Sequence, residues 1–130
     1  MSGFSDYLED KVLEHVFGGT AYTAPSTLYV ALYTVAPSDT GGGTEVSGGG
    51  YARQTSTFTV SGTNPTEATN ASAIEYPEAT ANYGTVVAVG VFDALTSGNL
   101  LAYSTLTASK TIDSGDVFRI NAGNLDITLA

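Results

Sequence analysis

The hydrophobic period of this sequence changes after the pair Gly18-Gly19, and this change limits the folds open to the chain. Over residues 4–17, apolar side chains recur at every fourth position, which is the spacing of one stripe on an amphipathic helix. From residue 27 onwards, apolar residues alternate with a period of two, which indicates strands. The sequence therefore predicts one N-terminal helix followed by β structure. The stripe consists of Phe4, Leu8, Val12 and Val16, widened by Leu13 and Phe17.

The segment 27–35 reads TLYVALYTV and is apolar on both of its alternating faces. Such a pattern predicts a central strand that is covered on both sides. A second strand is expected over 51–61 with Phe58 and Val60 pointing inward, and a third over 84–94. Further short strands are expected at 72–76, NLLAYSTL, VFRIN and LDITLA, whereas 62–71 has the composition of turns. Short strands separated by turns predict a mainly β fold, an antiparallel β-sandwich or jelly-roll-like domain with one N-terminal α-helix.

A chain of 130 residues suits one domain. We expect residues 1–19 to form a helix that packs on the domain or on a neighbour, because a short helix is marginal when it stands alone. Residues 20–130 are expected to form a single sandwich with a glycine-rich loop at 36–50. The helix start can be capped by Ser5 or Asp6.

The charge balance excludes several classes of partner. The net charge is −9, and the chain has four basic residues. Nucleic-acid backbones and anionic membrane surfaces both require clustered Lys and Arg, so neither is an expected partner. No apolar run reaches the length of a spanning helix, and the N-terminus is acidic where a signal peptide would be basic. The basic residues are scattered at Lys11, Arg53, Lys110 and Arg119.

No catalytic, cofactor or metal site can be assembled from the sequence. The glycine triplets at 41–43 and 48–50 lack the Lys that a phosphate loop requires, and a strand follows them instead of a helix. His15 is the single histidine and there is no cysteine, so a zinc site lacks ligands. Asp113 and Asp116 can donate oxygens to calcium, but Asp-Ser-Gly-Asp is also an ordinary turn.

The segment GGGYARQ suggests a contact surface instead. Glycines let a backbone approach a partner closely, and Tyr and Arg are enriched at interface hot spots. In so acidic a chain, Arg53 is a cation that can pair across a contact between subunits. The alternative is a hairpin loop with Arg53 in a solvent-exposed salt bridge. The candidate interface comprises Gly48, Gly49, Gly50, Tyr51 and Arg53, together with Leu8, Val12 and Val16 of the helix.

Several segments resemble a family of small tailed-bacteriophage virion proteins, commonly labelled tail-fibre or minor structural proteins. The most distinctive are GGGYAR and GVFDA, and the likeness extends through LYVALYT, YPEAT, GNLLAYSTL and DSGDVFRINAGNLDITL. The resemblance implies a non-enzymatic structural protein of the virion, with no catalytic residues and no cofactor. Its implied partners are other virion proteins and copies of itself.

The chain contains no internal repeat, which argues against a fibre shaft and favours a cap, an adaptor, or a capsid decoration or cement protein. A low fraction of charged residues, 13 %, and tyrosines on both faces of the strands favour a homo-oligomer, which we expect to be a trimer if the protein sits on a capsid. A carbohydrate-binding sandwich that recognises a host-surface glycan is the alternative function. The absence of Trp argues against that alternative.

Overall fold

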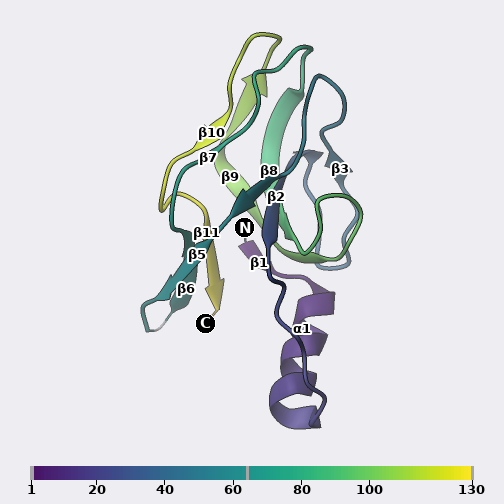
Figure 1. Ribbon diagram of the computed structural model, residues 1–130, viewed down its shortest axis with the longest axis vertical. Coiled ribbons are helices and arrows are strands. Elements are labelled where there is room, and N and C mark those ends of the chain that lie inside the picture. The colour runs from purple at the N-terminus through teal and green to yellow at the C-terminus, as the bar shows by residue number, and fades with distance from the viewer. Residues whose placement is uncertain (1, 64, 130) are drawn as a thin grey trace.

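The computed structural model describes residues 2–63 and 65–129. It confirms a mainly β fold with antiparallel strand pairs and one N-terminal helix (Figure 1). The helical elements are α1 (Asp6–Leu13) and a π-helical turn, η1 (Glu14–Gly18). The strands are β1 (Ser2–Phe4), β2 (Leu28–Val35), β3 (Thr44–Glu45), β4 (Gln54–Ser56), β5 (Phe58–Ser61), β6 (Thr66–Asn70), β7 (Ile74–Glu75), β8 (Gly84–Phe92), β9 (Leu100–Ile112), β10 (Arg119–Ile120) and β11 (Asp126–Leu129).

The largest sheet has the order β1-β9-β8-β2-β3, and β4 also pairs with β2. Strand β2 is central as expected, because Val30, Ala31 and Leu32 are completely buried and point alternately to the two faces. Its neighbour β8 is buried over most of its length. The apolar segments of the sequence therefore lie in the middle of this sheet.

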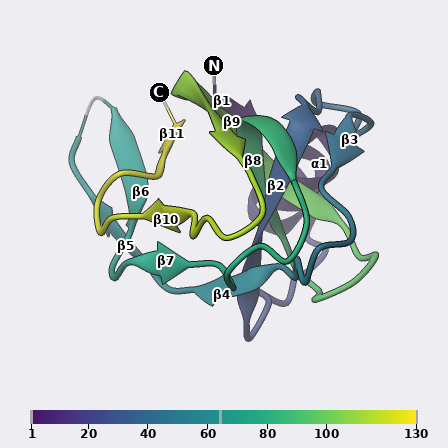
Figure 2. The same cartoon turned by 90° about the horizontal axis from the view of Figure 1, so that it is seen from above.

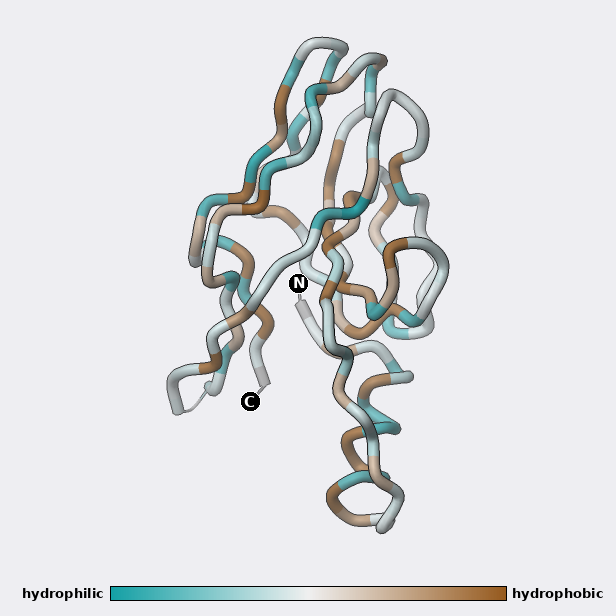
Figure 3. The backbone as a smooth tube through the Cα atoms, viewed as in Figure 1, coloured by the Kyte–Doolittle hydropathy of each residue, from teal (hydrophilic) through white to brown (hydrophobic). Residues whose placement is uncertain are grey.

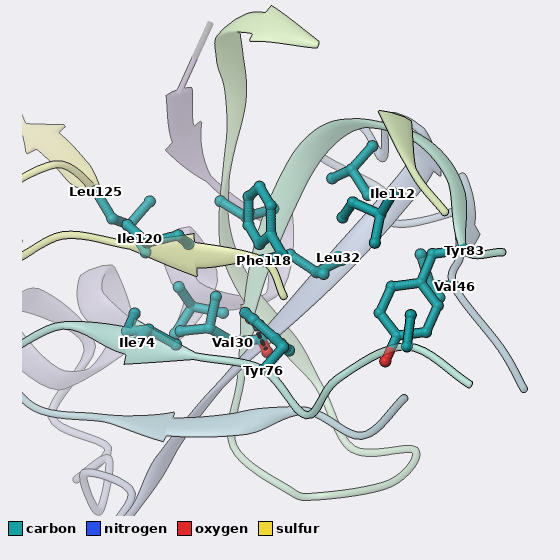
Figure 4. Close-up of a cluster of buried hydrophobic side chains, with 14 residues drawn as sticks. Val30, Leu32, Val46, Ile74, Tyr76, Tyr83, Ile112, Phe118, Ile120 and Leu125 are labelled. Atoms are coloured by element: carbon teal, nitrogen blue, oxygen red, sulfur yellow. Dashed lines mark hydrogen bonds between the residues drawn. The ribbon is translucent and has the colours of Figure 1, made fainter. Parts of the chain in front are cut away.

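A second layer covers one face of the large sheet. It consists of the β10-β7 pair and the sheet β11-β6-β5, which curve around to face β8 and β9 (Figure 2). Tyr76, which follows β7, joins the second layer to the large sheet, because its hydroxyl group donates to the Val30 carbonyl of β2 at 2.7 Å. Burying one such large apolar side chain stabilises the fold by about 1.5–3 kcal/mol. The main core comprises Val30, Leu32, Val46, Ile74, Tyr76, Ala79, Tyr83, Val86, Val89, Val91, Ile112, Phe118, Ile120 and Leu125 (Figure 4).

The opposite face of the large sheet carries a smaller apolar cluster, formed by Ala31, Tyr33, Ala88, Phe92, Leu100 and Tyr103. The loop after β2 lies over this cluster, since the Tyr103 hydroxyl donates to the Asp39 carboxylate. Arg53 covers the ring of Phe92. Coverage of both faces explains why β2 has no polar face.

The N-terminal segment differs from the expected helix over 4–17. Residues 2–4 form β1, which pairs with β9, and the helix begins only after Ser5. Ser5 caps it as expected, because its Oγ accepts from the backbone N–H of Leu8 at 3.2 Å. Gly19 ends the helical segment at φ 77°, a conformation that glycine adopts without steric cost.

Three other expectations about strands are corrected. The strand expected over 51–61 is two strands, β4 and β5, which pair with different sheets. Val60, expected to point inward, has 69 % of its surface exposed. The segment 62–71, expected to be turns, contains β6, whose polar residues pair with both β5 and β11.

Candidate functional site

The glycine triplet 48–50 packs against its own chain. All three glycines have positive φ angles, 76°, 62° and 79°. The Gly49 carbonyl accepts from the backbone N–H of Thr80 at 2.9 Å. A Cβ atom on Gly49 would lie 2.9 Å from the Ala81 carbonyl oxygen, so only glycine fits. The loop is therefore held by the segment around residues 80 and 81.

Tyr51 joins this loop to the core. Its hydroxyl group donates to Oε2 of Glu45 at 2.7 Å and accepts from the backbone N–H of Leu32 at 2.9 Å. Its ring stacks on Tyr76, with centroids 6.1 Å apart, and meets the ring of Tyr83 edge-on at 5.8 Å. Burial, the larger cause, and the hydrogen bond to Glu45, the second cause, raise the pKa of Tyr51 far above its usual value. Tyr51 is thus a neutral donor within the fold.

Arg53 forms a buried ion pair with Glu45. Nε and Nη2 of Arg53 donate to the two carboxylate oxygens of Glu45, each at 2.9 Å, in a bidentate pair. Nη1 donates to the carbonyls of Ala94 at 3.0 Å and Ser97 at 2.8 Å. The guanidinium carbon lies 3.7 Å from the centre of the Phe92 ring. Only 8 % of the Arg53 side chain is exposed.

This geometry gives Arg53 a partner within its own chain, whereas the sequence led us to expect that it pairs across a contact between subunits; a role of Arg53 in such a contact stays a prediction. Its carboxylate partner lies in the same chain, and four of the five N–H groups of a guanidinium are occupied there. The alternative, a salt bridge within the loop, agrees with the pair to Glu45, but the Arg53 side chain is buried and not exposed to solvent. A role for the outer surface of Gly48, Gly49, Gly50 and Tyr51 in assembly stays a prediction.

Glu45 is the residue that the sequence reasoning missed. Burial alone would raise the pKa of its carboxyl group, but hydrogen bonds from Arg53 and Tyr51 and the charge of Arg53 outweigh this and hold the pKa below 4.5. The available signal was its position in the segment Thr-Glu-Val, which alternates like a strand between the two glycine triplets. It forms β3 there and links the loop to β2.

The helical segment α1 and η1, residues 6–18, forms an arm that projects away from the sheets (Figure 1). An extended segment returns beside it to β2. The base of the arm is attached by the backbone N–H groups of Ser5 and Asp6, which donate to Leu101 and Asp39 at 2.8 Å each. Neither α1 nor η1 contains a buried residue in the described structure.

The three helix residues of the candidate interface lie on this arm. Leu8 and Val12 are half-buried, and Val16 is 60 % exposed. Leu13 and Phe17 are more exposed than the sequence stripe suggested, at 58 % and 82 %. The structure thus separates the two halves of the candidate interface. The glycine segment, residues 48–53, packs inward, and the end of the helix points outward.

A cleft of about 390 Å³ opens where the base of the arm meets the loop after β2 and the turn between β8 and β9. Burial raises the pKa of Tyr33 in this cleft to about 12, so its hydroxyl group remains a donor. The cleft combines aromatic with polar groups: Tyr7, Tyr33 and Phe92 with Asp6, Asp39 and Asn99.

The other candidates considered from sequence have structural partners. Nδ1 of His15 accepts from the backbone N–H of Tyr22 at 3.0 Å. The carboxylate of Asp116 accepts from the backbone N–H of Asp113 at 3.0 Å, which is the hydrogen bonding of a turn. Within the described ranges, no group of three or more His, Cys, Asp or Glu residues could hold a metal ion. Helices long and apolar enough to cross a membrane are absent from the same ranges.

The comparison with known families agrees with the resemblance seen in the sequence. The model of a family described as podophage GP4 fiber I protein gp80 matches residues 3–128. The match includes the arm, the glycine segment and all the strands of the large sheet except the start of β1. A comparison with curated proteins finds no match. The chain belongs to the podophage GP4 fiber I protein family.

Proposed function

We propose that this chain is a non-enzymatic protein that holds neighbouring virion proteins together through protein–protein contacts made by its projecting arm. Membership in a phage fibre family makes it a structural component of the virion. The observation that carries the finer proposal is the exposure of apolar side chains on the arm, with Phe17 at 82 %. A protein rarely leaves apolar side chains grouped in water unless a partner covers them.

The absence of enzymatic activity is part of the proposal. His15, the base that a serine-type mechanism with histidine would use, lies on the exposed arm and accepts from a backbone N–H group. A Ser or Thr nucleophile activated by histidine needs its hydroxyl group within hydrogen-bond reach of the ring, and among the described residues the hydrogen bond of His15 comes from the backbone of Tyr22 instead. The fold instead uses its polar side chains to hold loops, as Glu45 and Arg53 do.

Self-association is a second component of the proposal, and we place it on the body, which is the part of the chain outside the arm. The outer half of β9 presents exposed Thr, Ser and Ala side chains between residues 105 and 109, with no charge among them. A neutral surface loses little solvation of charged groups when it is buried, so it suits a contact between identical acidic chains. We propose a homo-oligomer, a trimer where the particle offers threefold symmetry. Light scattering of the purified protein tests this proposal in solution. Two findings together would refute it: only monomers in solution, and single, separate copies in the particle.

The test of the function is to locate the protein in the particle. Quantitative mass spectrometry of gradient-purified virions should find it at a constant copy number. Immuno-electron microscopy with an antibody against the body should label the tail region, whereas labelling of the head would assign it a decoration or cement role. Absence of the protein from purified virions would overturn the proposal.

Glycan binding is a second candidate function, favoured by the cleft at the base of the arm. Aromatic rings can stack on sugar faces, and carboxylates and amides can bond to sugar hydroxyls. The cleft provides both through Tyr7 and Asn99. A glycan array should then show specific binding that Tyr7→Ala removes, and an array without any bound sugar would exclude this candidate.

A further inference from the structure

The far end of the arm concentrates exposed apolar side chains. We call Leu13, Val16 and Phe17 the arm tip. Figure 3 shows hydrophobic stretches of chain towards the far end of the arm. Leu13 ends α1, and Val16 and Phe17 follow in the π-helical turn η1, so all three lie at the far end of the arm within one short stretch of chain. Peptides that insert a helix into an apolar groove present grouped apolar side chains of this kind. The remaining large exposed apolar side chains of the described residues lie on separate parts of the body: Val35, Val60, Leu95 and Val117.

The arm around this tip is acidic. Its exposed carboxylates are those of Asp6, Glu9, Asp10 and Glu14. The single lysine of the arm, Lys11, is half-buried, and its ammonium group lies 5.5 Å from the centre of the Tyr7 ring. A protein surface that receives the arm must therefore offer an apolar floor for the tip and positive charge beside it.

A second copy of this chain does not provide such a surface. Its net charge is −9 with four basic residues, so a second copy has little positive charge to place beside the acidic arm. The guanidinium group of Arg53 is buried against Glu45, and that of Arg119 lies 3.3 Å from Glu75. Lys110 is then the one cation of the described body without a carboxylate within salt-bridge distance, and a single charge does not make a basic rim.

We infer that the arm tip docks into an apolar groove bordered by Lys and Arg side chains on a different virion protein. This inference rests on the proposed function and specifies its partner. The arm is 13 residues long, so it extends by about 15–20 Å. That length lets the tip enter a neighbouring subunit while the sheets remain outside it. The base of the arm is fixed to β9 by Ser5, which gives the docked helix a defined direction.

Site-specific photo-cross-linking in assembled virions tests this inference. Phe17 is replaced by p-benzoylphenylalanine, and the variant is supplied to phage that lack their own copy of the gene. Val60→p-benzoylphenylalanine serves as the control, because Val60 is similarly exposed but lies on β5. After irradiation of purified virions, mass spectrometry identifies the cross-linked peptides. We expect Phe17 to cross-link to a different virion protein, within a segment that contains apolar residues and Lys or Arg.

Two results would overturn the inference: a cross-link from Phe17 to a second copy of this chain, or no cross-link from Phe17 above that of the Val60 control. A second measurement covers the possibility that the bulky probe disturbs docking. Leu13→Ser with Phe17→Ser should reduce the copy number per virion by about tenfold or more, since two apolar contacts are lost. An unchanged copy number for this double variant would also overturn the inference.

Charge variants complete the test. Glu9→Gln with Asp10→Asn should also reduce incorporation, but by a several-fold smaller factor than the double variant of the tip. The difference between this charge variant and the wild type should disappear when assembly takes place in high salt, because salt screens the charges. The matched control is Val60→Ser, which should leave the copy number unchanged. If wild-type protein is absent from virions, the proposed function fails. If it is present and unaffected by the arm variants, only the docking inference fails.

Discussion

The glycine segment and the arm show opposite relations between regular structure and burial. Residues 48–53 form neither helix nor strand, yet only 8 % of the Arg53 side chain among them is exposed. The arm is regular, yet none of its described residues is buried. A helix satisfies most of its own backbone hydrogen bonds and can therefore project into solvent. An irregular segment must find hydrogen-bond partners on the body, and this requirement draws it inward.

This contrast separates stability from assembly. Changes in the glycine segment should lower the free energy of unfolding, because its side chains bond to β3 and to the turn between β8 and β9. Changes in the arm tip should leave that free energy almost unchanged. The following variants test the contrast in order of their expected effect.

The largest loss is expected for Arg53→Ala. The substitution removes four hydrogen bonds and leaves the half-buried Glu45 carboxylate without its cation. Breaking a buried pair costs about 3–5 kcal/mol, and the 26 % exposure of Glu45 reduces this to about 3 kcal/mol. Urea unfolding followed by circular dichroism measures it. Arg119→Ala is the matched control: its pair with Glu75 is exposed, so its loss should cost about 0.5 kcal/mol or less.

An equal loss in the two arginine variants would contradict the contrast. It would mean that the Glu45 pair is as open to solvent as the Glu75 pair. Loss of assembly by Arg53→Ala at unchanged stability would restore the original expectation that this residue contacts another subunit.

Gly49→Ala is expected to have the next largest effect. Gly49 has a positive φ angle, and its added methyl group would lie 2.9 Å from the Ala81 carbonyl oxygen. Gly48 has a similar φ angle but open space around a Cβ atom. Gly48→Ala should therefore cost about 1 kcal/mol for the left-handed backbone alone, and Gly49→Ala about 1–3 kcal/mol more. Thermal unfolding of both variants gives the difference. Equal melting temperatures would show that the loop does not pack on residue 81.

The sequence predicted the fold well where burial follows a period. The apolar alternation of 27–35 identified the central strand, and Val30 and Leu32 indeed lie in the core. It failed for β6, because Thr66–Asn70 carries polar residues whose strand conformation depends on pairing with β5 and β11. Pairing partners distant in sequence are not visible in a local pattern.

The candidate site was predicted only in part, for a related reason. The arm was identified as a helix with an apolar stripe, and the structure shows that stripe exposed at its far end. The partner of Arg53 could not be identified, because thirteen carboxylates were available in the sequence and only the fold places Glu45 beside it. Residue type indicated that this arginine would form an ion pair, but it could not distinguish a partner within the chain from one outside it.

A smaller effect is expected from pH. The pKa of Glu45 in the folded protein lies below 4.5, since the bonds from Arg53 and Tyr51 outweigh the effect of burial. The ionised carboxylate therefore stabilises the fold above pH 4.5, and this contribution is lost as the pH falls through the folded pKa. Wild-type protein and Glu45→Gln should differ most near pH 7 and converge towards pH 3. Urea unfolding between pH 3 and 7 measures both curves. Parallel curves would show that Glu45 is not ionised within the cluster.

The smallest effect on stability is expected for Phe17→Ser, which tests the other half of the contrast. With 82 % of its surface exposed, Phe17 buries little apolar area, and Phe and Ser have similar helix propensities. The free energy of unfolding should change by about 0.5 kcal/mol or less. Leu32→Ala is the comparison, because Leu32 is fully buried and its truncation should cost about 2–5 kcal/mol.

A loss above about 1 kcal/mol for Phe17→Ser would mean that the arm folds back onto the body in solution. The arm tip would then be part of the core, and docking on a neighbouring protein would first require its release. Unchanged stability together with reduced incorporation into virions is the result that keeps the two roles apart. It would show that Phe17 contributes to a contact outside the chain, while the glycine segment contributes to the fold itself.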